Sequence, residues 1–211
     1  MTVSPEVLLQ AYRSGIFPMA EHRDDPEMFW VDPRRRGIIP MDGLRISRSL
    51  ARRLRRDDYL VTFDRDFEAV IDACADRRET WISHDIRSLF LELHRLGVGH
   101  SIEVWMDGAL AGGVYGVEIG AAFCGESMFS RRRDGSKIAL CWLIDLLSRA
   151  DFTLFDTQFL TEHLASLGGI EVERAQYRSL LAEALARSSN LAGTLLAASG
   201  QEVVQRNAQT S

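Results

Sequence analysis

Residues 101–130 read SIEVWMDGALAGGVYGVEIGAAFCGESMFS, and this stretch carries the strongest β-strand pattern in the chain. Asp107-Gly108 stands between two strand-like runs, and this dipeptide is a strong signal for a tight hairpin turn. A second turn is expected near Glu118–Gly120. The stretch therefore predicts three antiparallel strands, at about residues 100–106, 109–117 and 121–128.

The segment after this meander alternates between helix and strand. Residues 135–149 (GSKIALCWLIDLLSR) are mostly apolar and predict a buried helix, and residues 152–158 (FTLFDTQ) predict a buried strand. A short helix and a last amphipathic helix at 173–187 are expected to follow. This order predicts an α/β (α+β) fold with a mixed sheet flanked by helices.

The predicted order resembles the core of the GCN5-related N-acetyltransferases. In those enzymes a glycine-rich loop before a helix cradles the pyrophosphate of coenzyme A. Residues 130–136 (SRRRDGS) hold one glycine where that loop needs at least two. The framework therefore fits an acyltransferase, but the coenzyme A loop does not.

The residues before the meander predict helices at 5–14, 47–56, about 64–75 and 85–96, with a strand at 59–63. Residues 16–40 contain four prolines and predict a loop without regular structure that wraps the core. We expect residues 1–60 to form this wrapping segment and a basic helix as part of the same unit. Residues 61–187 are expected to form the acyltransferase-like catalytic domain, and residues 188–211, rich in Ala, Ser, Asn and Gln, a flexible tail.

The composition fits a compact cytoplasmic protein. Of 211 residues 46% are hydrophobic, which is enough for a sizeable core. No run approaches the ~18 apolar residues of a membrane span, and the N-terminus does not read as a signal peptide. Cys74, Cys124 and Cys141 form no CxxC pair, so neither a disulfide framework nor a zinc site is expected. We therefore predict no membrane association and no metal.

The net charge of −5 argues against a dedicated nucleic-acid binder, but the basic residues are clustered. One cluster lies within residues 45–56 and a second is the run Arg131–Arg133. Focused arginine patches on an acidic protein can bind a phosphate backbone locally. The alternative is a solvated helix face, which charge alone does not exclude.

Several stretches, in order, resemble the leucyl/phenylalanyl-tRNA–protein transferases. They are YRSGIFPM (12–19), WVDPR (30–34), LRISRSL (44–50), TWIS (80–83), HSIEVW (100–105), LAGGVYGV (110–117), FCGESMFS (123–130) and DTQFLTEHLASLG (156–168). The most specific feature is FCGESMFS followed by D-x-Q-x-x-x-x-H-x-x-S-L-G. The resemblance spans roughly residues 8–180; Met19 departs from it, because a tryptophan often stands there.

The resemblance implies that leucine or phenylalanine, with methionine as a further donor side chain, moves from aminoacyl-tRNA to the N-terminal α-amine of a protein. Acceptors would begin with Arg or Lys, and the product would carry an N-terminal residue that marks it for degradation. The reaction is aminolysis of an ester, and it needs no metal or coenzyme. An α-amine has a pKa of about 7.7–8, so part of it is neutral at cellular pH.

By resemblance Asp156 and Gln158 are the family's catalytic pair, and they stand two apart so that their side chains point the same way. Asp156 would orient or deprotonate the amine, and Gln158 would hydrogen-bond the aminoacyl group or the developing oxyanion. Glu126 would bind the donor's α-amino group or the acceptor. The structural alternatives are that Asp156 caps the helix near Thr161 and that Glu126 pairs with one of Arg131–Arg133.

The resemblance also implies substrate-binding positions. Trp30 and Trp81 would stack on the terminal adenosine. The amino acid side chain would lie among apolar residues, which could equally be plain core: Val114, Met128, Leu140, Leu143, Leu147 and Phe155. The tRNA phosphates would contact Arg45, Arg48, Arg52, Arg53, Arg131, Arg132 and Arg133.

Two other functions fit parts of the sequence. One is an acyl-CoA-dependent N-acetyltransferase, which the single-glycine loop disfavours; the other is a non-catalytic tRNA-binding module. A Ser166–His163–Asp156 triad is rejected, because all three residues fall on one strand–helix segment without a GxSxG turn.

Overall fold

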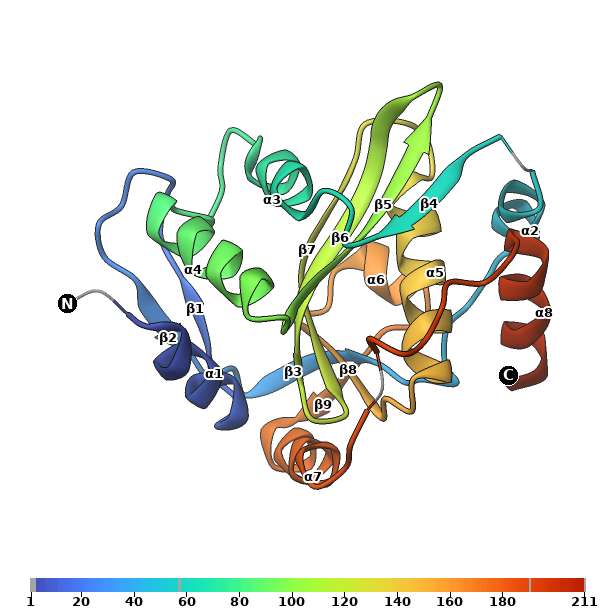
Figure 1. The fold of residues 1–211 in the computed structure, drawn as a ribbon. Helices are drawn as coiled ribbons and strands as arrows, with labels where there is room; N and C mark the ends of the chain where they lie inside the picture. The colour runs from blue at the N-terminus through green and yellow to red at the C-terminus, as the bar shows by residue number, and fades with distance from the viewer. Residues whose placement is uncertain (1–2, 57, 190, 211) are drawn as a thin grey trace.

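The computed structural model describes residues 3–56, 58–189 and 191–210, and its centre is a seven-stranded mixed sheet (Figure 1). The strand order is β4-β5-β6-β7-β8-β3-β9, and β1 and β2 pair separately. The strands are β1 (Phe17–Met19), β2 (Phe29–Val31), β3 (Arg35–Ile39), β4 (Leu60–Phe63), β5 (Gly99–Met106), β6 (Ala109–Ile119), β7 (Ala122–Ser130), β8 (Leu154–Gln158) and β9 (Ile170–Glu173). The helices are α1 (Pro5–Arg13), α2 (Arg48–Leu54), α3 (Phe67–Ala75), α4 (His84–Arg95), α5 (Gly135–Arg149), α6 (Glu162–Ser166), α7 (Arg174–Leu185) and α8 (Gly200–Thr210).

The predicted meander is confirmed as β5, β6 and β7, which pair antiparallel. Asp107 and Gly108 both have positive φ, 52° and 75°, and this backbone matches the twist of a two-residue hairpin. Strands β6 and β7 run slightly longer than predicted, and the second turn lies at Gly120 and Ala121. The α/β (α+β) fold class with a mixed sheet flanked by helices is therefore confirmed.

Helices cover both faces of the sheet, which gives the molecule two apolar cores. α1, α3, α4 and α7 contribute to the first core, and α5 fills the second with α2 and α8 outside it (Figure 1). α5 spans the residues predicted for it and is buried along nearly all its length. Among the described residues, no helix combines the length and apolar character needed to cross a bilayer.

The prediction of an irregular loop over residues 16–40 is wrong. This segment forms β1, β2 and β3, and β3 lies inside the main sheet between β8 and β9. Pro33 and Pro40 flank β3 and do not interrupt it, so the prolines mark its ends. The run Arg36–Ile39 is buried. The sequence does not show this, because two arginines and Gly37 interrupt any alternation of apolar and polar residues.

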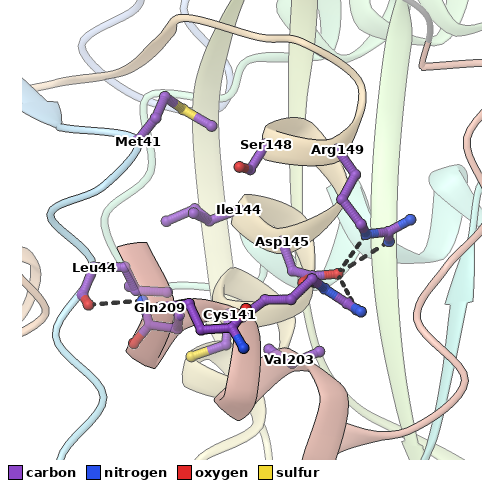
Figure 2. Close-up of a pocket in the computed structure, with 11 residues that line it drawn as sticks. Met41, Leu44, Cys141, Ile144, Asp145, Ser148, Arg149, Val203 and Gln209 are labelled. Carbon is purple, nitrogen blue, oxygen red and sulfur yellow. Dashed lines mark hydrogen bonds and ion pairs between the residues drawn. The ribbon is translucent and has the colours of Figure 1, made fainter. Parts of the chain in front are cut away.

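The prediction of a flexible tail from residue 188 is wrong where the chain forms α8. Val203 and Val204 are buried against the second core, and Arg206 binds Asp145 of α5 through Nε–Oδ1 and Nη2–Oδ2 distances of 2.6 and 3.1 Å. Arg149 also reaches Asp145 (Figure 2). A polar composition concealed this helix, because only two of its residues are buried valines and its ion pairs join partly exposed arginines to the buried Asp145. Strand β9 was also missed, because only four residues form it and only one of them is buried.

Candidate functional site

A cavity opens where β7 and β8 stop pairing. The parallel ladder ends at Cys124 and Asp156, while β7 continues to Ser130. The cavity beside this divergence has a volume of about 810 Å³, within the range of small-molecule sites. β7, the end of β8, α3, α5, α6 and the α3–α4 connection all supply lining residues, among them Arg77, Trp81, Glu126, Ser136, Gln158 and His163.

Glu126 lines this cavity from an irregular position of β7. Tyr115 pairs with Ser127 and Gly116 with Gly125, so Glu126 is left between two pairs as the extra residue of a bulge. Bulges turn a side chain away from the regular pleat, and they are common beside active sites. The local backbone thus gives Glu126 an orientation that its neighbours do not share.

Glu126 as a whole residue is 6% exposed, its carboxyl oxygens are buried, and neither oxygen has a hydrogen-bond partner among the described residues. Burial raises the pKa of Glu126 to about 8, while Tyr12 and Gln158 oppose the rise. Both of these groups face the carboxyl, but the Tyr12 hydroxyl and the Gln158 amide nitrogen complete no hydrogen bond of good geometry. Three buried polar groups therefore meet beside the cavity without satisfying one another.

Asp156 is completely buried and has all its acceptor positions occupied. Arg36 donates to both oxygens at 2.8 and 2.6 Å, the Tyr177 hydroxyl donates at 2.8 Å, and the Gln158 backbone N–H donates at 2.8 Å. Thr161, not Asp156, caps α6, so the capping alternative does not hold. The arrangement suits Asp156 to holding backbone and neighbours in place, because no lone pair is directed to the cavity.

Arg36 is the residue that sequence reasoning missed. Its guanidinium lies 4.5 Å from the ring centroids of both Phe17 and Tyr177, and it also donates to the Gly15 carbonyl. Burial lowers the pKa of Arg36 and Asp156 raises it, and the net effect keeps the guanidinium charged. The run of three arginines at 34–36 contained this residue, but nothing in the sequence separates the buried one from its exposed neighbours.

Gln158 ends β8 in a left-handed conformation, with φ of 61°. Such a conformation is uncommon for a residue other than glycine and is often found at functional sites. Gly37 of β3 lies opposite, where a Cβ would stand 2.6 Å from the Phe159 carbonyl carbon. The close approach of β3 thus allows β8 to turn and present Gln158 to the cavity.

Most of the predicted apolar pocket lies elsewhere. Met128 lines the cavity, but the other five predicted positions are buried in the core on the α5 face of the sheet and are not among its lining residues: Val114, Leu140, Leu143, Leu147 and Phe155. The core alternative therefore describes their packing. Their pattern of i, i+3 and i+7 on α5 is what an ordinary buried helix shows.

The two tryptophans are placed differently. Trp81 lines the cavity, whereas Trp30 lies on β2, is 38% exposed and is not among the lining residues. Trp81 reaches the cavity from the α3–α4 connection, and its carbonyl accepts from Ala20. Of the two, Trp81 is therefore the one positioned to stack on a ligand in the cavity.

The two arginine clusters occupy different parts of the surface. Arg131, Arg132 and Arg133 are exposed at the turn between β7 and α5, and Arg131 lines the cavity. Arg45, Arg48 and Arg52 are exposed, while Arg53 is half-buried and pairs with Asp58 beside α2. Glu126 makes no ion pair with the 131–133 cluster among the described residues; Arg131 pairs instead with Asp76 and Arg133 with Asp134.

His163 and Thr157 also border the cavity with buried polar atoms that lack partners in the described part of the chain. Ser166 donates to the His163 carbonyl, so its hydroxyl is turned into its own helix and the triad remains rejected. Within the described ranges, no three His, Cys, Asp or Glu side chains gather closely enough to hold a metal ion.

Comparisons with known proteins agree on one family. Residues 38–182 match the model described as leucyl/phenylalanyl-tRNA protein transferase, and residues 1–34 match that of its N-terminal domain. The leucyl/phenylalanyl-tRNA–protein transferase of Ruegeria sp. (strain TM1040) is 61% identical over 211 residues, which is 100% of each chain. The same enzyme of Ruegeria pomeroyi is 59% identical, again over 100% of each chain.

Two solved structures are similar at lower identity. L-PGS from Bacillus licheniformis has a TM-score of 0.41 and 15% identity, covering 76% of this chain and 55% of that chain. A GCN5-related N-acetyltransferase-like protein from Streptococcus suis has a TM-score of 0.34 and 13% identity, covering 66% and 59%.

Proposed function

The chain belongs to the leucyl/phenylalanyl-tRNA–protein transferase family, and we propose that the cavity between β7 and β8 is where the aminoacyl ester meets the acceptor amine. The protein is an aminoacyltransferase that takes an aminoacyl-tRNA as donor and a protein as acceptor. Leucine and phenylalanine are the donor amino acids proposed here, with methionine tolerated, because an apolar site separates similar side chains by only about 1–3 kcal/mol.

The unpartnered polar groups around the cavity carry this proposal. Glu126, Gln158 and Tyr12 are buried next to one another, and each retains hydrogen-bonding atoms with no partner in the described chain. Leaving such groups unsatisfied costs free energy, so their concentration at one cavity indicates that a polar ligand completes them. The ester carbonyl can accept hydrogen bonds from these groups, and the α-amines of the donor amino acid and of the acceptor protein can donate hydrogen bonds to them.

The division of labour follows from the contacts. The Gln158 amide nitrogen faces Glu126 but completes no hydrogen bond of good geometry in the described chain, so it can donate to the ester carbonyl and to the oxyanion that forms when the amine attacks. Asp156 holds Gln158 through its backbone N–H and is held in turn by Arg36. We assign Asp156 an orienting role, since positioning of the two reactants supplies much of the acceleration of an aminolysis.

Acceptors with N-terminal Arg or Lys are proposed from the family resemblance. Glu126 is buried at the cavity, and Asp76 lies exposed at its rim, where Arg131 contacts it. Arg77 also lines the cavity, so a cationic side chain would reach Asp76 by replacing its contact with Arg131. The product would carry a bulky apolar N-terminus, which marks a protein for degradation.

The tRNA would approach from the side of Trp81 and Arg131. Because Trp81 lines the cavity, we expect it to stack on the terminal adenine, and we expect the exposed Arg131–Arg133 at the adjoining turn to contact nearby phosphates. The arginines of residues 45–53 form a second basic surface on and before α2, for more distant phosphates. Contacts to backbone alone would allow several tRNAs to bind.

The direct test is transfer of labelled leucine from leucyl-tRNA to peptides that differ only at the first residue. Arg- and Lys-initiated peptides should accept leucine, whereas Glu-initiated and N-acetylated peptides should not. Acetyl-CoA offered in place of leucyl-tRNA should give no product. Equal labelling of the Glu-initiated peptide would contradict the acceptor assignment, and acetyl transfer would favour an acyl-CoA enzyme.

A further inference from the structure

We propose that Glu126 is the proton acceptor for the attacking α-ammonium. Asp156 cannot serve in this role, because all of its lone pairs are already engaged. The proposal rests on the proposed function and adds to it the identity of the group that carries the proton. It follows from the geometry of two neighbouring carboxyls. Asp156 has every lone pair engaged, whereas Glu126 is approached by Tyr12 and Gln158 without a hydrogen bond of good geometry.

A bulge in the β7 backbone directs the Glu126 side chain to the cavity. As the extra residue of the β7 bulge it is released from the regular alternation of side chains between the two faces of the sheet. It is 6% exposed, so water reaches it poorly when the cavity is filled. A carboxyl that is buried and yet makes no ion pair among the described residues is expensive to keep, which favours a use over a structural role.

The groups that face Glu126 come from several elements. Tyr12 comes from α1 and Tyr115 from β6; Asp156 belongs to β8 and Arg36 to β3. Arg36 and Asp156 neutralise each other, so an ionised Glu126 would be a second negative charge without a counter-ion. An entering ammonium supplies that counter-ion at the moment when it must lose a proton.

The proton affinities of the two groups match. The pKa of Glu126 is raised to about 8, chiefly by burial, and an α-amine has a pKa of about 7.7–8. Transfer of a proton between groups of nearly equal pKa is almost thermoneutral, which is the condition under which general base catalysis is most effective near that pH. An ordinary exposed glutamate, with a pKa of about 4.3, would be a far weaker base.

The step balances without a further reactant. The ionised form of Glu126, a minority at pH 7 for a pKa of about 8, takes one proton from the ammonium, and the neutral nitrogen forms a bond to the ester carbonyl carbon. The bond from that carbon to the ribose 3′ oxygen breaks with its electron pair on the oxygen. This oxygen takes the second proton that the nitrogen loses, and Glu126 returns its proton to water, so one H⁺ is released per transfer.

Glu126→Gln tests the proposal, because glutamine keeps the shape and cannot take the proton. In single-turnover transfer from leucyl-tRNA at pH 7 the rate constant should fall about 100-fold or more, while the KM for the acceptor changes less. Above pH 8 the ratio of the wild-type to the variant rate constant should fall by about tenfold for each pH unit, because the amine is then already neutral when it enters the cavity. A variant within threefold of wild type at pH 7, or a deficit independent of pH, would overturn the proposal.

Glu126→Ala with added carboxylates gives a second readout that a structural role would not move. Formate and acetate should each restore part of the rate, and acetate, the stronger base, should restore more. Gln158→Leu is the matched control, since it disrupts the same cavity but should respond to neither anion. If carboxylates restore nothing although the variant binds leucyl-tRNA, Glu126 is not the proton acceptor.

Wild-type protein in the same assay distinguishes a failure of the proposed function from a failure of the Glu126 assignment. If wild type fails to transfer leucine to any acceptor, the proposed function fails. If wild type transfers leucine and Glu126→Gln transfers it equally well, only the assignment of Glu126 fails.

Discussion

At the scale of single residues, the contact between Arg36 and Asp156 decides what the site can do. The pair is almost completely buried, with side-chain exposures of 2% and 0%. Its worth as an ion pair is small, since desolvating two charges costs nearly what their attraction returns. Its importance is geometric, because the same carboxylate fixes the Gln158 backbone in its left-handed turn.

Replacing Asp156 with Asn should therefore destabilise the protein strongly. The substitution leaves the Arg36 charge buried without a partner, and losses of about 3–5 kcal/mol are typical of that event. Urea unfolding of Asp156→Asn against wild type measures this change in the free energy of unfolding. Tyr177→Phe, which removes one hydrogen bond to the same carboxylate, should lose only about 1.5–3 kcal/mol. Wild-type stability in Asp156→Asn would show that Asp156 is not the counter-ion of a buried charge.

At the scale of secondary-structure elements, the cavity lies where β7 and β8 diverge, and β3 contacts the end of β8 that lines it. Gly37 brings β3 against the backbone of residues 159 and 160. The ladder between β3 and β8 shifts register between Gly37 and Ile38, at the level of Gln158. One glycine on a neighbouring strand thus sets the position of a side chain that lines the cavity.

Gly37→Ala should impair transfer more than it impairs folding. A Cβ at this position would lie 2.6 Å from the Phe159 carbonyl carbon and 2.7 Å from the Leu160 nitrogen, so the end of β8 must shift. Overpacking of this kind typically costs about 1–3 kcal/mol of stability, while a displaced Gln158 should lower the transfer rate at least tenfold. Ile38→Val, on the adjacent residue, is the control and should keep full activity. Full activity in Gly37→Ala would show that the position of Gln158 does not depend on the contact between Gly37 and the end of β8.

The sequence predicted most elements from local signals and missed those that depend on distant partners. The meander and α5 follow from a DG turn and a continuous apolar helix, and both are confirmed. β3 was missed because its partners, β8 and β9, lie more than a hundred residues away and no local alternation marks it. The same reason hides Arg36: its burial comes from contacts with Phe17, Asp156 and Tyr177, which only the fold brings together.

At the scale of the whole molecule, buried titratable groups couple stability to pH. Burial lowers the pKa of His100, but Asp64 and Glu118 raise it to about 9, and Asp64 accepts from its Nδ1 at 2.6 Å. The pKa of Glu126 is raised as well. Both groups bind protons more tightly in the folded chain than in the unfolded one, so both contributions are present at low pH and disappear as the pH rises.

The free energy of unfolding should therefore decline between pH 6.5 and 9. The His100 contribution is full below its unfolded pKa of 6.5 and is lost as the pH passes about 9. His100→Gln should flatten this decline, and Glu126→Gln should flatten the part that lies below pH 8. Denaturant unfolding at a series of pH values measures both. A wild-type stability that rises over this range would refute the assignment of these two groups.

The two basic surfaces should contribute separately to tRNA binding. Each phosphate contact contributes about 0.7–0.9 to the slope of log affinity against log salt. Replacing Arg131, Arg132 and Arg133 with Gln should reduce that slope and weaken binding of every donor tRNA alike. Replacing Arg48 and Arg52, on α2 beside α8, tests the second surface in the same titration. Unchanged slopes in both variants would show that these arginines do not contact tRNA phosphates and are ordinary solvated surface residues.

A structure with a bound analogue, in which leucine is joined to 3′-amino-3′-deoxyadenosine by a stable amide, tests the central claim most directly. The leucyl group should lie between β7 and β8, with its carbonyl oxygen within hydrogen-bond distance of the Gln158 amide and Glu126 beside the carbonyl carbon. Trp81 should lie against the adenine. An analogue seated in the separate cavity of about 260 Å³ between α5 and α8, or one that leaves Glu126 and Gln158 untouched, would contradict the account.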